Sequence, residues 1–87
     1  MRDLQLPGRS PVITSNGMVS TSQPLSTSAA LTVLKDGGNA MDAALAACAV
    51  QAVVEPASTG IGGDCFCRYA PANSQDVIAI NGSGRAP

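Results

Sequence analysis

The sequence contains no histidine and no tryptophan, and Phe66 and Tyr69 are the only aromatic residues among its 87. Without histidine, the chain lacks the side chain that most often serves as a general base or metal ligand near neutral pH. The shortage of aromatics also removes the side chains that bury the most apolar area. A small domain built mainly on alanine has little to offset its chain entropy. We therefore expect these residues to form part of a larger fold.

Charge is sparse and balanced, with five basic and six acidic residues. No basic cluster of the kind that binds nucleic acid or an anionic membrane is present, so neither partner is expected. The N-terminus lacks the apolar segment of a signal peptide. The longest apolar stretch, 40–54, would be roughly 22 Å long as a helix, shorter than the roughly 30 Å hydrocarbon layer of a membrane. We expect a cytoplasmic protein, and a secreted or periplasmic one stays open if the natural start is missing.

The three cysteines, Cys48, Cys65 and Cys67, are an odd number and predict no disulfide framework. Cys48 lies in the alanine-rich stretch, where we expect it to be a small buried apolar residue. Cys65 and Cys67 stand two apart in a predicted strand, so both would face the same side. Three thiols without a histidine leave a tetrahedral metal site incomplete. Neither a metal nor another cofactor is expected.

Residues 1–16 are rich in turn signals and predict an irregular lead. Residues 17–87 predict elements in the order β-α-α-β-β, namely 17–21, 23–36, 40–54, 65–70 and 76–80. Ser22 is the expected cap of the first helix, and the pair Gly37-Gly38 is expected to end it, because glycine can take the left-handed conformation of a C-terminal cap. Asn39 is the expected cap of the second helix, with Asp42 in its first turn. That helix is apolar on all sides, so it must be covered on all sides.

A glycine-rich loop, TGIGGD (59–64), follows the second helix. It lacks the Gly-Lys-Ser/Thr of a P-loop, and it opens a strand where a dinucleotide fingerprint opens a helix. Its glycines permit unusual dihedrals and close backbone approach. We expect a tight turn that holds the strand against the second helix, with anion binding as the alternative. Asp64, at its end, is explained by a capping role.

Arg85 follows a Gly-Ser-Gly segment at the exit of the last predicted strand. A guanidinium there is a candidate anchor for a carboxylate ligand, because it binds carboxylates with two parallel hydrogen bonds. The alternative is an ordinary surface arginine.

Five segments, taken together, resemble the N-terminal part of the large subunit of gamma-glutamyltranspeptidase family proteins. They are GRSPV (8–12), GMVSTSQPLST (17–27), LKDGGNAMDAALAA (34–47), VVEPASTGIGGDCF (53–66) and NGSGRAP (81–87), and they follow in order over nearly the whole chain. The resemblance implies an α/β (α+β) fold, as a fragment of the αββα sandwich of N-terminal nucleophile hydrolases.

The resemblance also implies a proenzyme that cuts itself into a large and a small subunit. The new N-terminal threonine of the small subunit would be the nucleophile, with its own amine as base. The gamma-glutamyl group of glutathione or a related amide would pass to this threonine, then to water or an acceptor amine. The implied partners are the rest of the large subunit, the small subunit and a small-molecule gamma-glutamyl or acyl-amide substrate.

One position departs from the pattern of the family, which places its carboxylate-binding arginine four residues before the closing proline. Here that position is Ser83, and the arginine is Arg85. We take both as candidate substrate-binding residues, although Ser83 cannot supply the charge. Either Arg85 binds the carboxylate from a shifted position, or the substrate is not a gamma-glutamyl compound.

The residues that carry catalysis in the family would lie beyond Pro87, so the 87-residue chain alone is expected to be inactive. A non-enzymatic alternative is a truncated product, or a small interaction module that uses its exposed alanine helix.

Overall fold

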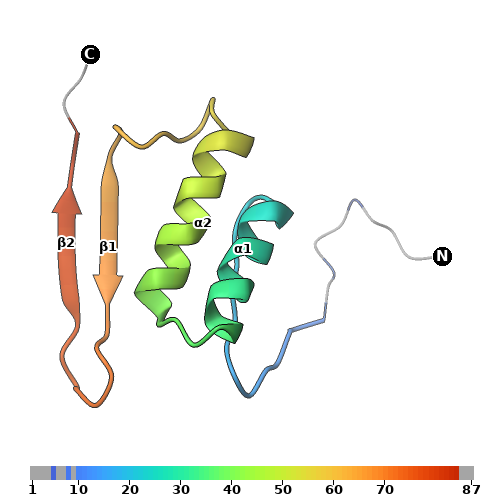
Figure 1. Ribbon diagram of the computed structural model, residues 1–87, viewed down its shortest axis with the longest axis vertical. Coiled ribbons are helices and arrows are strands. Elements are labelled where there is room, and N and C mark those ends of the chain that lie inside the picture. Colours follow the sequence, from blue (N-terminus) through green and yellow to red (C-terminus); the bar gives the residue numbers. More distant parts are fainter. Residues whose placement is uncertain (1–4, 6–7, 9, 85–87) are drawn as a thin grey trace.

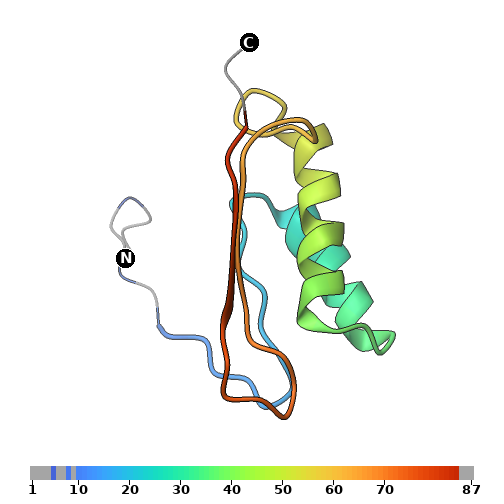
Figure 2. The same cartoon turned by 90° about the vertical axis from the view of Figure 1, so that its left-hand side faces the viewer.

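The computed structural model describes residues 5, 8 and 10–84 of the chain. Its elements are α1 (Pro24–Lys35), α2 (Ala40–Val54), β1 (Cys65–Tyr69) and β2 (Ile78–Gly82). The two helices lie side by side, and the hairpin of β1 and β2 lies beyond α2 (Figure 1). Seen from the side, the hairpin and the extended stretch before α1 occupy one layer and the helices a second (Figure 2).

The start of α1 differs from its predicted cap. Gln23 is the N-cap, and its side chain accepts a hydrogen bond from the Leu25 N–H at 2.5 Å. Pro24 occupies the first turn, where its missing N–H leaves no hydrogen bond unmade. The prediction of Ser22 as the cap is wrong, because its hydroxyl instead donates to Glu55 Oε2 at 2.9 Å.

The connection between the helices matches its prediction. Gly37 has a φ of 95°, and the Gly38 N–H donates to the Val33 carbonyl at 2.9 Å, which ends α1 in a Schellman motif. Asn39 Oδ1 accepts from the Asp42 N–H at 2.8 Å, and Asp42 Oδ2 accepts from the Asn39 N–H at 3.1 Å. This reciprocal capping box confirms Asn39 as the cap of α2 and fixes a very short turn.

Gly38→Ala is expected to destabilise the helical hairpin by about 1–3 kcal/mol. A Cβ at Gly38 would lie 2.5 Å from Val33 Cγ1 and 3.0 Å from the Val33 carbonyl oxygen, so the turn would have to shift. Urea titration followed by circular dichroism measures the change. Gly62→Ala is the matched control, because no atom lies within 4 Å of its added methyl. Equal effects of the two substitutions would contradict the prediction.

Only small side chains are buried between the two helices. The buried residues are Ala30, Ala43 and Ala47, together with Ser26, which is 0% exposed. On its other sides α2 is open, with Leu45 63% and Val53 78% exposed. Cys48 is exposed as well, so the prediction that it is buried is wrong. The described residues therefore do not provide the cover that an all-apolar helix requires.

The strand predicted at 17–21 is extended but belongs to no sheet in the described part of the chain, where β1 pairs with β2 alone. A strand needs a partner for its backbone N–H and C=O groups. The hairpin is antiparallel, with Cys65 opposite Gly82 and Tyr69 opposite Ile78. Its second strand begins two residues later than predicted, because the Asp76 N–H donates to Ser74 Oγ at 3.1 Å within the turn.

The chain exposes much more surface than a self-contained protein of its size. Its accessible surface is 7348 Å² for a mass of 8.7 kDa. A compact monomer of that mass would expose roughly 4,700 Å². The radius of gyration is 15.4 Å, against roughly 12 Å for a compact domain of this length. Within the described residues, neither helix has the length and apolar character needed to cross a membrane.

Candidate functional site

The candidate site lies at the end of the hairpin where β1 begins and β2 ends. Cys65 and Gly82 form the last pair of the ladder. A Cβ at position 82 would lie 2.7 Å from the Cys65 carbonyl oxygen, so only glycine fits this close approach. The chain then leaves the ladder through Ser83 and Gly84.

Ser83, one of the two site residues predicted from the sequence, is exposed and held by its neighbour. Its Oγ donates to Asn81 Oδ1 at 2.6 Å, and its backbone N–H donates to the same oxygen at 3.2 Å. This local turn holds the Ser83 hydroxyl beside Asn81. The other predicted residue, Arg85, lies outside the described residues.

Asp64 is a residue of this site to which the sequence analysis gave only a capping role. It immediately precedes β1, and its Oδ1 accepts a hydrogen bond from the backbone N–H of Gly84, 20 residues further along the chain. A Cβ at Gly84 would lie 2.9 Å from that oxygen, so the two segments are in close contact. The sequence holds one signal of this contact: Asp64 directly precedes the first strand of the hairpin, and the second strand ends in Gly-Ser-Gly.

The glycine-rich loop 59–64 forms a turn, with the Gly63 N–H donating to the Gly60 carbonyl at 3.3 Å. Its glycines do not adopt unusual dihedrals, because Gly37 is the only glycine with positive φ in the described part of the chain. Between the loop and α2 lies a hollow of about 280 Å³, lined by Cys48, Cys65 and Asp64 among others.

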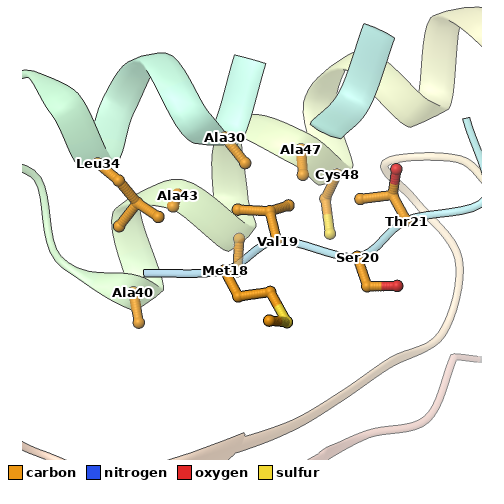
Figure 3. A pocket seen from close by; sticks show the side chains of 11 residues that line it. Met18, Val19, Ser20, Thr21, Ala30, Leu34, Ala40, Ala43, Ala47 and Cys48 are labelled. Atoms are coloured by element: carbon orange, nitrogen blue, oxygen red, sulfur yellow. The ribbon is translucent and has the colours of Figure 1, made fainter. Parts of the chain in front are cut away.

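A second hollow, of about 360 Å³, lies where α2 faces the extended stretch 18–21. Figure 3 shows Met18 and Val19 on one side of it and the small side chains of the helices on the other. Residues 40, 44 and 48 of α2, spaced four apart, line it with two alanines and a cysteine. We call the row Ala40, Ala44 and Cys48 the open face of α2.

At the C-terminal end of α2, a network of four polar side chains joins the two helices. Buried Ser26 donates to Gln51 Oε1 at 2.5 Å, and Gln51 Nε2 donates to Ser22 Oγ at 2.6 Å and to the Glu55 carboxylate. Every buried side-chain nitrogen and oxygen in the described residues has a hydrogen-bond partner. The network fixes the end of α2, from which the loop to Asp64 departs.

Comparison with known proteins identifies relatives of this chain. The family model described as gamma-glutamyltranspeptidase matches residues 26–87. The glutathione hydrolase proenzyme of Bacillus subtilis (strain 168) is 42% identical over 72 residues, which are 83% of this chain and 12% of that protein. The oxamate amidohydrolase proenzyme of Klebsiella pneumoniae is 40% identical over 74 residues, which are 85% of this chain and 14% of that protein.

The fold is similar to that of a solved structure as well. The crystal structure of Helicobacter pylori gamma-glutamyltranspeptidase matches with a TM-score of 0.71 and 38% identity, over 80% of this chain and 20% of that one. The match confirms the predicted α+β fold class, as part of a larger architecture. The chain spans 12–14% of the length of these two curated relatives.

Proposed function

Because this chain belongs to the gamma-glutamyltranspeptidase family, we propose that it is the N-terminal part of the large subunit of an acyl-transferring enzyme. The enzyme would transfer the gamma-glutamyl group of glutathione, or the acyl group of a related carboxylate-bearing amide, to water or an amine acceptor. The observation that carries this proposal is the family match over residues 26–87, which includes the NGSGRAP segment.

The nucleophile would be the N-terminal threonine of the small subunit. Its amine takes the proton of its own hydroxyl as the oxygen attacks the amide carbonyl, and the leaving amine then receives that proton. Water or an acceptor amine next attacks the acyl-threonine ester and frees the enzyme.

Arg85 would bind the carboxylate of the substrate. Its guanidinium can donate two parallel hydrogen bonds to a carboxylate, a geometry that lysine cannot reproduce. Ser83 would offer a hydroxyl but no charge beside it. Glutathione and oxamate, after which the two relatives are named, both combine a free carboxylate with an amide bond. That shared chemistry fits an arginine anchor next to an acyl-transfer nucleophile.

The rest of the large subunit and the small subunit would be the partners that cover the open surface of this chain. Its accessible surface of 7348 Å² exceeds that of a compact monomer by roughly 2,600 Å². Obligate interfaces bury about 2,000–5,000 Å² or more counted over both partners, about half of it on each, so an excess of roughly 2,600 Å² on one chain matches the upper end of that range. Exposed apolar residues such as Phe66, Ile80 and Val53 belong to that surface.

Expression of the longer polypeptide tests this function. We expect mass spectrometry to show two chains, the smaller beginning with threonine, and we expect release of the leaving amine from glutamyl amides or oxamate. Replacement of that threonine by alanine should abolish both cleavage and turnover. A stable, uncleaved chain without amidase activity would contradict the proposal.

A further inference from the structure

We propose that Asp64 is a positioning residue for the carboxylate anchor at Arg85. The inference rests on the proposed function, in which Arg85 binds the carboxylate of the substrate. Asp64 would act through the backbone of Gly84, the residue directly before Arg85 in the sequence, without touching substrate itself.

Two observations join Asp64 to this backbone. Its Oδ1 accepts the Gly84 N–H, and a hydrogen bond from an amide to an ionised carboxylate is roughly twice as strong as a neutral one. The fit is also close, since a Cβ at position 84 would lie 2.9 Å from Oδ1 and 3.4 Å from the Gly63 carbonyl carbon. A methyl group at position 84 would therefore press on this carboxylate and displace it from the amide.

The hydrogen bond from Gly84 to Asp64 matters because the other hydrogen bonds of residues 83–84 are local. Beyond Gly82, where the ladder ends, Ser83 bonds only to Asn81 among the contacts in the described residues. That turn orients Ser83 relative to β2 but does not join it to another element. The bond from Gly84 joins the strand exit to the start of β1 and so to the glycine-rich loop.

The orientation of a substrate-binding group matters because acyl transfer requires the amide carbonyl and the nucleophile in near-attack geometry. A misplacement of about 1 Å can lower the rate about a hundredfold. Asp64 would therefore set where the carboxylate is held relative to the threonine. Asp76, the other acidic residue of the hairpin, lies in its turn at the opposite end of the strands.

The test compares Asp64→Ala, Asp64→Asn and Asp76→Ala in the full-length enzyme. We expect Asp64→Ala to lower kcat/KM for a carboxylate-bearing amide about tenfold or more, because the displaced anchor binds the carboxylate less well, which raises KM, and holds the amide outside near-attack geometry, which lowers kcat. Asp64→Asn keeps an Oδ1 acceptor and should restore most of the parental kcat/KM. Asp76→Ala removes an exposed carboxylate of equal charge and should leave kcat/KM unchanged. Gly84→Ala, which crowds the same bond with Asp64 intact, should reproduce the decrease in kcat/KM.

Hydrogen exchange at the Gly84 amide separates the failure of this inference from failure of the proposed function. We expect faster exchange in Asp64→Ala and near-parental exchange in Asp64→Asn. If Arg85→Ala raises KM but Asp64→Ala changes neither kcat/KM nor Gly84 exchange, the positioning role is overturned. A faster Gly84 amide with an unchanged kcat/KM would overturn it as well. If Arg85→Ala itself leaves KM unchanged, the carboxylate anchor fails and this inference fails with it.

Discussion

Arg85→Ala in the full-length proenzyme is expected to raise KM for carboxylate-bearing amides by about 30- to 1,000-fold, which corresponds to about 2–4 kcal/mol of lost binding. The loss is large because the substrate carboxylate would lose both hydrogen bonds of the guanidinium while it stays desolvated. The expected change in kcat is smaller, since a carboxylate away from the reacting carbonyl is bound about equally in ground and transition states. Steady-state kinetics on a glutamyl amide measures both constants.

Three comparisons make the result specific to Arg85. Self-cleavage of the proenzyme should proceed as in the parent, because it involves no free substrate carboxylate. Arg68→Ala removes an exposed arginine from the middle of β1 and should leave KM unchanged. Arg85→Lys should recover only part of the affinity, since an ammonium cannot form the two-bond geometry. Equal KM values for Arg85→Ala and the parent would rule out the anchor.

The helical half of the fold could be predicted from the sequence because its signals are local. The Asn39–Asp42 capping box and the left-handed Gly37 each depend on hydrogen bonds between residues at most five apart. The N-cap of α1 was placed one residue too early, because the Ser22 hydroxyl binds Glu55, 33 residues away. Local chemistry cannot reveal a partner at that distance.

The strand layer and the site were harder to predict for the same reason. Residues 17–21 have the composition of a strand but no ladder partner within the described residues. Cys48 lies on a face of α2 that these residues leave open. The Asp64–Gly84 bond follows only from the register that sets Cys65 opposite Gly82. That register follows a turn that contains the Ser74–Asp76 hydrogen bond.

The second prediction with a large expected effect is a substitution on the open face of α2. Ala44 is exposed and lines the hollow beside Met18. In the 87-residue chain, Ala44→Asp should lower helix stability by only about 0.7 kcal/mol, the difference in helix propensity. In the longer polypeptide, the proposed remainder of the protein would cover this face. The same substitution should then destabilise by more than about 3 kcal/mol, since it buries an unpaired charge.

Urea unfolding of both forms measures the two values, and the yield of mature subunits gives a second readout in the longer one. Ala72→Asp is the matched control, because Ala72 is exposed in the hairpin turn and lines neither hollow described above. It should have a small effect in both forms. The loss of helix propensity is the same in both forms of the Ala44 variant. Any additional loss of stability in the longer form therefore measures the burial of position 44 by the rest of the protein. If Ala44→Asp is as mild there as in the 87-residue chain, this face of α2 stays solvated, and the excess surface must be covered elsewhere.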